Sequence, residues 1–308
     1  MANQQGVNRQ EQTTTIRQPA SANFLVDSLD RDDNSPDAGN FSINKKNSLF
    51  NGFFNRLAVQ EVVLEYGIPN VSQVNENDTF AFTYDFGAGP VVDIVSIPPG
   101  WYSVADALDT LVDQMNTAVG VPNAFKIVGT GFGPVSMDVD QAVVPGGTFE
   151  INEEGPAGQI NNLGIQIFSL ELLDIGQNAS YKILSPRILP YRYLDIVSPQ
   201  LTYNQNLKDA DTSQNSRDVL YRWYFAWDNE PNYYDAYGFP ILQGYRQFVA
   251  RRLIAYPKQI KWNANQPIGS IQFQVFNDID ELVLTSEFPA SGGVAELEFQ
   301  MTFLLSED

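Results

Sequence analysis

The chain has 308 residues, of which 43% are hydrophobic and 12% aromatic, enough for one large all-β domain or two average domains. It contains no cysteine and no histidine. Disulfides, Ser–His–Asp and Cys–His mechanisms, and most zinc, copper and non-haem iron sites are therefore excluded. Carboxylate and lysine chemistry stay open, but this composition favours a protein that is not an enzyme.

The net charge is −19, from 18 basic and 37 acidic residues. Such a chain repels nucleic-acid phosphate unless its basic side chains gather on one face, so we expect no specific nucleic-acid binding. There is no run of eighteen apolar residues and no basic-then-apolar leader. The sequence thus predicts neither a membrane span nor a signal peptide.

Residues 1–20 are rich in Gln, Asn and Thr and poor in core-forming side chains, which predicts a weakly ordered, flexible N-terminal arm. The arm is either a frayed terminus or a segment that threads under a partner, and the residues favour neither. A short strand is expected at 22–27.

The turn-rich segment 27–40 comes next and invites a calcium-site interpretation. It gathers the four aspartates Asp30, Asp32, Asp33 and Asp37. An EF-hand loop starting at Asp30 would need Gly at its sixth position and Glu at its twelfth, where the chain has Ser35 and Phe41. We predict a solvated acidic turn and no metal site.

Runs rich in β-branched and aromatic residues then predict strands at short spacing, separated by Asn, Gly and Pro. They cover residues 41–45, 57–68, 79–86 and 91–97. This pattern is typical of a sandwich or a barrel. Glu61 and Glu65 share one strand face, but no sugar-binding context accompanies them, so we assign no catalytic residue.

The segment 101–119 changes to helical spacing. Its apolar residues are Val104, Leu108, Leu111, Val112 and Met115. Ser103 with Asp106 resembles a capping box and Gly120 marks the end, so we expect one helix near 103–118.

Further strands are expected at 124–130, 135–140, 148–152 and 165–170. Gly129, Gly131 and Gly133 lie between strands, which argues against a dinucleotide-binding loop, and we assign no cofactor.

Residues 188–227 form two aromatic-rich extended runs joined by a polar loop. In the second run the odd-numbered and the even-numbered positions are both largely apolar. Because these positions face opposite sides of a strand, we expect a second sheet or a neighbouring subunit to cover both faces. Residues 241–270 hold five of the eighteen basic residues and no acidic one, which favours a complement to an acidic neighbouring subunit. The clear alternation in 294–305 predicts a terminal strand inside a sheet.

Together these elements predict an all-β fold: a single jelly roll, that is, an eight-stranded antiparallel β-sandwich, with an inserted α+β subdomain carrying one helix. We assign residues 21–98 and 180–308 to the jelly roll and residues 99–179 to the inserted subdomain.

Several segments, in order along most of the chain, resemble the penton (vertex minor capsid) proteins of virophages and related double-stranded DNA viruses of the double-jelly-roll lineage. They are residues 28–31 (SLDR), 57–71 (LAVQEVVLEYGIPNV), 97–118 (beginning IPPGWYS), 160–165 (INNLGI), 193–212 (beginning YLDIVSPQ), 260–263 (IKWN) and 299–308 (FQMTFLLSED).

The resemblance implies a structural capsid protein that forms homopentameric pentons at the five-fold vertices of an icosahedral shell. It implies contacts with surrounding trimers of the double-jelly-roll major capsid protein, further contacts with other minor capsid proteins, a place in the virion, and assembly in the host cytoplasm or viral factory. The alternative function is a carbohydrate- or receptor-binding jelly-roll module on a virion or cell surface, with Tyr233, Tyr234 and Tyr237 as candidate contacts.

Overall fold

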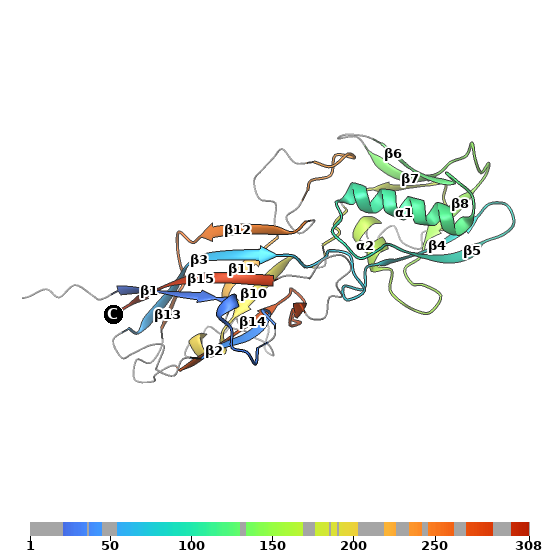
Figure 1. Cartoon of the computed structure of the whole chain (residues 1–308). Helices are drawn as coiled ribbons and strands as arrows, with labels where there is room; N and C mark the ends of the chain where they lie inside the picture. The colour runs from blue at the N-terminus through green and yellow to red at the C-terminus, as the bar shows by residue number, and fades with distance from the viewer. Residues whose placement is uncertain are drawn as a thin grey trace, which may run out of the picture.

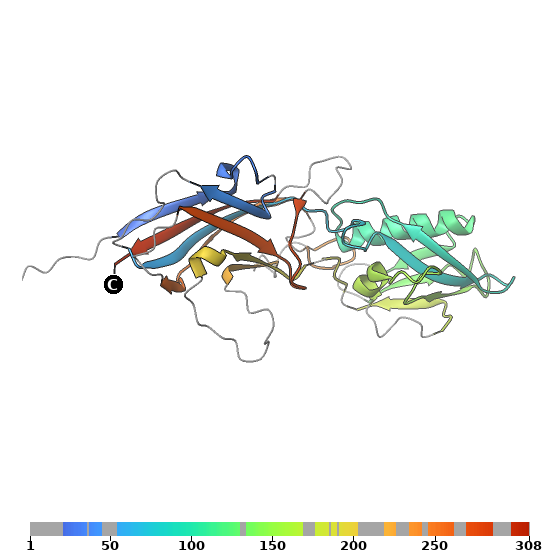
Figure 2. The ribbon, with the colours of Figure 1, turned by 90° about the horizontal axis from the view of Figure 1, so that it is seen from below.

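The computed structural model describes residues 21–35, 37–44, 54–129, 134–168, 176–184, 186–189, 191–202, 219–225, 234–241, 246–261, 269–285 and 297–307. They form two bodies placed end to end, each with its own hydrophobic core. Figure 1 shows this elongated shape, and the view from below in Figure 2 agrees with it. The arm expected at 1–20 lies outside the described residues.

The first body is a sandwich of two antiparallel sheets. One sheet has the order β1-β15-β3-β12, with β13 also paired to β3, and the other has the order β11-β10-β14-β2. The first sheet contains β1 (Ser21–Asp27), β15 (Leu297–Ser306), β3 (Arg56–Tyr66), β12 (Phe248–Leu253) and β13 (Gln259–Lys261). The second contains β11 (Val219–Tyr224), β10 (Tyr193–Val197), β14 (Ser270–Phe276) and β2 (Asn40–Asn44).

This order defines a jelly roll. Consecutive strands cross between the two sheets, except for the hairpin pair β10 and β11 and the two segments β12 and β13, which both pair with β3. Short helices, η1 (Ser28–Asp30) and α3 (Pro199–Thr202), follow β1 and β10. The jelly-roll fold predicted from the sequence is confirmed.

The C-terminal strand β15 forms the centre of the first sheet. Its inward positions are all buried: Leu297, Phe299, Met301, Phe303 and Leu305. Burying each such side chain contributes about 1.5–3 kcal/mol. Across the sandwich, Phe299 meets Phe41 and Phe273 with ring centroids 5.4 and 6.2 Å apart, so this strand joins both sheets.

The second body combines two three-stranded sheets with two helices. The sheets have the orders β5-β4-β8 and β6-β7-β9. The strands are β4 (Thr79–Asp85), β5 (Val91–Ser96), β6 (Phe125–Val128), β7 (Val135–Val139), β8 (Thr148–Ile151) and β9 (Ser180–Ile183). Helix α1 (Val104–Val119) packs on β5 and β6. Its N-terminus carries the capping box expected from Ser103 and Asp106, and its C-cap is Gly120 with φ 69°.

Helix α2 (Asn162–Phe168) stands where the sequence predicts a strand at 165–170, and that prediction is wrong. Asn161 caps the helix, because its Oδ1 accepts a hydrogen bond from the Gly164 N–H at 2.9 Å. The alternating apolar residues also fit a helix, since Leu163 and Ile167 both face the core at i, i+4 spacing.

The inserted body is larger than residues 99–179. The chain passes from the first core to the second between Ile68 and Val71, and returns between Ile188 and Tyr191. Strands β4, β5 and β9, which we expected in the jelly roll, therefore belong to the core that contains α1 and α2. The alternation of a strand marks its buried face but does not identify the sheet that covers it.

Both passages between the bodies meet at one buried side chain, Asn70. Its Nδ2 donates to the carbonyl oxygens of Tyr102 and Ile188 at 2.8 and 2.9 Å, and its Oδ1 accepts from the Tyr102 N–H at 2.8 Å. A second tie comes from Asp235, whose Oδ2 accepts from the Ala105 N–H at 2.9 Å at the start of α1. These bonds hold both chain passages, and the segment that carries Asp235, to the inserted body.

We predict that Trp223→Ala destabilises the jelly roll by about 3–5 kcal/mol, because this fully buried ring, 6.3 Å from that of Phe248, would leave a cavity. Denaturant unfolding followed by circular dichroism measures the change. The control Ile279→Ala removes an exposed side chain and should cost within about 0.5 kcal/mol. Equal effects of the two substitutions would contradict the packing described.

Candidate assembly surface

One side of the sandwich is formed by the outer strands of both sheets, β11 and β12. The two strands are joined by ring and cation contacts across the gap between the sheets. The guanidinium of Arg252 lies 4.2 Å from the centroid of the Trp223 ring and donates to the Tyr224 carbonyl oxygen at 3.2 Å. This side is therefore a continuous surface rather than two separate strand edges.

An ion pair fixes β11 to its neighbour β10. Arg222 donates from Nε and an Nη to the two oxygens of Asp195 at 2.6 and 2.7 Å, and its guanidinium lies 3.8 Å from the Tyr193 ring centroid. The hydrogen bonds to the carboxylate of Asp195, which is 6% exposed, raise the pKa of Arg222. The geometry is bidentate, so this pair also sets the orientation of the strand.

A groove of about 400 Å³ opens on this side. It is lined by Val59, Val219, Leu220, Tyr221, Arg222, Tyr224, Ile254, Tyr256 and Lys258. The lining combines apolar and aromatic side chains with two cations and holds no acidic side chain. Such a lining suits a protein surface that offers apolar groups and carboxylates.

Beside the groove, β12 and β13 lie along the same neighbouring strand and are separated by residues 254–258. Both pair with β3, and the Ile254 N–H donates to the Gln60 carbonyl oxygen at 2.8 Å where the interruption begins. The interruption exposes Tyr256, whose relative accessibility is 96%. Edge strands interrupted in this way present side chains to a partner instead of a regular backbone edge.

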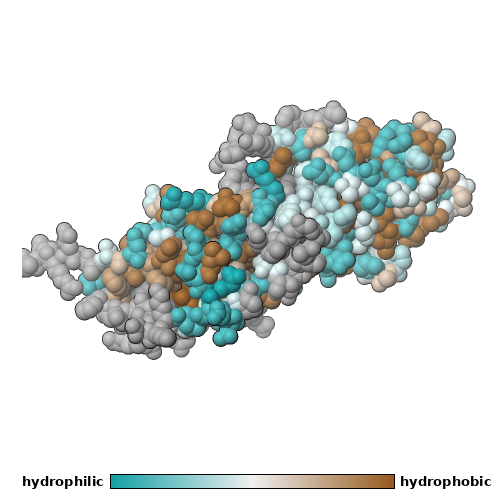
Figure 3. Space-filling view, viewed as in Figure 1, coloured by the Kyte–Doolittle hydropathy of each residue, from teal (hydrophilic) through white to brown (hydrophobic). Residues whose placement is uncertain are grey.

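Large apolar side chains stand exposed along the same side. Val249 is 64% exposed and Leu253 71%, both on the outer face of β12. Figure 3 shows hydrophobic residues at the surface above β12. Isolated exposed apolar residues are ordinary. Val249 and Leu253 flank the exposed Arg251 on one strand face and, with Tyr256 beside the groove, make this side a candidate interaction surface.

The basic stretch at 241–270 lies on this side, as far as it is described. Arg246 and Lys258 are exposed at opposite ends of β12. Arg251 forms an ion pair with Glu61 on β3, and its Nη2 donates to Glu61 Oε2 at 3.0 Å. We call the surface formed by Arg246, Val249, Leu253, Tyr256 and Lys258 the basic edge.

The two carboxylates Glu61 and Glu65 have different partners on the neighbouring strands. Glu61 is neutralised by Arg251, and Glu65 lies opposite Glu298 and Val249 on neighbouring strands. Among the described residues no cluster of acidic side chains could hold a metal ion. No described helix is long and apolar enough to cross a membrane.

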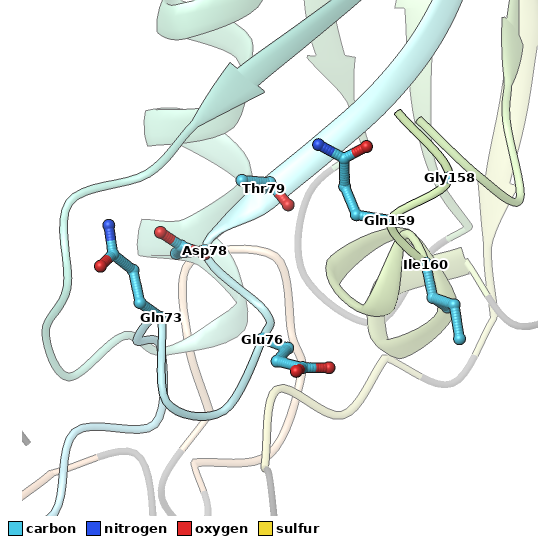
Figure 4. Close-up of a pocket in the computed structure, with 7 residues that line it drawn as sticks. All are labelled: Gln73, Glu76, Asp78, Thr79, Gly158, Gln159 and Ile160. Atoms are coloured by element: carbon cyan, nitrogen blue, oxygen red, sulfur yellow. The ribbon is translucent and has the colours of Figure 1, made fainter. Parts of the chain in front are cut away.

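A second hollow, of about 460 Å³, lies in the inserted body. Its lining residues are Gln73, Glu76, Asp78, Thr79, Gly158, Gln159 and Ile160. In Figure 4 these side chains spread around the hollow and do not converge on one point. The lining lacks an aromatic platform, and we assign it no ligand.

Of the tyrosines considered for carbohydrate binding, Tyr237 packs against the inserted body. The Tyr237 hydroxyl donates to Asp109 on α1, and the ring packs against the core of the inserted body. Its pKa is raised, by burial first and then by that carboxylate. Tyr234 is exposed, and Tyr233 lies outside the described residues.

Comparison with known proteins identifies the fold. Neither a protein-family profile nor a curated protein matches the sequence. The crystal structure of the mavirus penton protein matches with a TM-score of 0.53 and 9% sequence identity, over 94% of this chain and 100% of that one. A chain in the cryo-EM structure of the Sputnik virophage matches with a TM-score of 0.45 and 11% identity, over 93% and 97% of the two chains. The match to the mavirus penton protein shows that the chain has a penton-like fold, as its sequence resemblance implies.

Tyr66 lies beneath the basic edge, with its ring centroid 4.7 Å from that of Phe225 and 5.4 Å from that of Phe248. Burial, followed by repulsion from Tyr191, raises the pKa of Tyr66 well above its usual value. Above a pH of about 10 the unfolded chain releases this proton while the folded chain keeps it, so stability falls as the pH rises.

We therefore predict that Tyr66→Phe loses less stability between pH of about 9 and about 11 than the unmodified protein does. Urea unfolding at the two pH values measures this difference. Tyr256→Phe is the matched control, since it removes the same hydroxyl from a ring that is 96% exposed, and it should leave the alkaline loss unchanged. An undiminished alkaline loss in Tyr66→Phe would contradict the effect of burial.

Proposed function

We propose that this protein is a structural capsid protein that forms homopentameric pentons at the five-fold vertices of an icosahedral shell. In this role it contacts the surrounding trimers of the major capsid protein, and other minor capsid proteins, as part of the virion. It performs no catalysis. Assembly takes place in the host cytoplasm or the viral factory.

The observation that carries the proposal is the match to the mavirus penton protein over nearly the whole of both chains. The match includes the jelly roll and the inserted body together. A jelly roll alone occurs in many functional classes, so the shared two-body arrangement is the more informative part.

The chemistry of the chain supports a structural role. It lacks two residue types on which the Ser–His–Asp and Cys–His mechanisms and most transition-metal sites depend, because it has no cysteine and no histidine. Two buried polar side chains serve the fold: Asp195 pairs with Arg222 between β10 and β11, and Asn70 joins the outgoing passage to Tyr102 and Ile188. The exposed apolar patch of the basic edge calls for cover by a protein partner.

We predict that the purified protein forms pentamers, and that pentamers mixed with the major capsid protein of the same particle occupy five-fold positions in the resulting shells. Native mass spectrometry measures the stoichiometry, and electron microscopy locates the added density. A protein that stays monomeric at every soluble concentration and does not enter shells would contradict the proposal. Binding to a glycan array that Tyr234→Ala abolishes would favour the carbohydrate-binding alternative.

A further inference from the structure

The sandwich has a second exposed apolar patch, on the side away from the basic edge. Leu25 on β1 is 61% exposed and Leu29 in η1 is 59% exposed. Figure 3 shows hydrophobic residues at the surface in this region as well. A single chain thus exposes apolar side chains at both sides of its jelly roll.

The charges around this second patch are acidic. Asp30 and Asp33 are exposed next to Leu29, and Asp27 is partly exposed at the end of β1. Residues 21–44 contain five aspartates and one arginine. We call the surface formed by Leu25, Asp27, Leu29, Asp30 and Asp33 the acidic edge.

The geometry of these carboxylates is set by the fold. Asp27 accepts from the Leu29 N–H at 2.9 Å and from Gln300 on β15 at 2.7 Å. The loop that carries Asp33 is held to β2, because the Asp32 N–H donates to the Ser42 carbonyl oxygen at 3.0 Å. The acidic edge is therefore an ordered surface.

The two edges lie on opposite sides of the molecule. In the first sheet the order β1-β15-β3-β12 places β1 and β12 at the two outer positions. In the second sheet β2 and β11 occupy the two outer positions. The contact between Arg252 and Trp223 places β11 on the same side of the sandwich as β12. Figure 1 shows β12 and β1 separated by β3 and β15.

We propose that copies of this chain associate head to tail, with the acidic edge of one copy docked on the basic edge of the next. This inference rests on the proposed capsid function and names the surfaces that join its subunits. The exposed charges that define the basic edge, Arg246 and Lys258, are positive, and those that define the acidic edge, Asp30 and Asp33, are negative. The partly exposed Glu61, Glu65 and Arg31 reduce this contrast in charge but do not reverse it. Charge complementarity of this kind sets the register of an interface and rejects wrong pairings.

Both halves of the interface are present on every copy, which selects a second copy as the occupant. The chain has a net charge of −19 but concentrates five of its eighteen basic residues in the stretch 241–270. This concentration favours a role for the stretch in binding an acidic surface. Contact between two different patches is heterologous, and it closes into a ring when the rotation between copies permits. A closed ring covers the two patches on all copies.

The test reverses the exposed charges of one edge at a time. The acidic-edge variant is Asp30→Lys with Asp33→Lys, and the basic-edge variant is Arg246→Glu with Lys258→Glu. Each should weaken subunit association about tenfold or more, because each opposes like charges across the interface. The variant with all four substitutions restores opposite signs and should assemble again.

The matched control reverses two exposed charges on the inserted body, with Asp113→Lys and Lys182→Glu, and should assemble like the unmodified protein. Native mass spectrometry and analytical ultracentrifugation measure association, and circular dichroism verifies that each variant is folded. Recovery of assembly in the variant with all four substitutions shows that the two edges dock on each other. A loss of association caused only by the changed net charge of the chain would not require these two edges to be in contact.

The outcomes separate this inference from the proposed function. If pentamers persist in both single-edge variants, the capsid proposal stands and the docking of these edges is overturned. If a ring of another size forms and responds to the reversals as described, the docking stands and the pentamer is overturned. If the major capsid protein binds the basic edge in competition with self-association, the occupant is that protein, and the inference is overturned. A chain that remains monomeric overturns both.

Discussion

The pairing of β3 with β15 is the constraint on which the rest of the structure depends. It runs in register from Tyr66 opposite Leu297 to Arg56 opposite Ser306, with one irregularity. It brings a strand from the end of the chain between two strands from its beginning. Because β15 lies between β1 and β3, the first sheet ends at β1 on one side and at β12 on the other. The positions of both charged edges follow from this single pairing.

The same pairing explains how the jelly roll accommodates a second body. The insertion leaves after β3 and returns before β10, so it interrupts one connection between the sheets and no strand pairing within them. Asn70, on the outgoing passage, forms hydrogen bonds with Tyr102 of the inserted body and Ile188 of the returning passage, and Asp235, between β11 and β12, accepts a hydrogen bond from the start of α1. A buried side chain that satisfies three backbone groups is costly to replace, which favours a fixed arrangement of the two bodies.

Much of this fold could be predicted from the sequence. Strict alternation identified β15, and helical spacing with the Ser103–Asp106 capping box identified α1. The limits of the insertion were missed, because β4 and β5 have strand patterns that fit either core. Helix α2 was mistaken for a strand, since its cap at Asn161 is a single side chain whose role depends on the local backbone.

The candidate surface was predictable only in part. The concentration of basic residues at 241–270 indicated an interaction surface, and it lies at an outer strand of the sandwich. The exposure of Tyr256 depends on the interruption between β12 and β13, which contains Pro257. A proline indicates a break in strand pairing, but it does not predict which neighbouring side chain the break exposes. The acidic turn at 27–40 was considered as a metal site, and its relation to the basic edge emerges from the topology of the sheets.

Zero-length cross-linking of the assembled protein tests the docking of the two edges most directly. A carbodiimide joins amines to carboxylates in direct contact, and a mixture of isotopically light and heavy chains separates links between copies from links within one. We expect links between Lys258 of one copy and Asp30 or Asp33 of another. Assembled particles in which Lys258 links only to other carboxylates would contradict it.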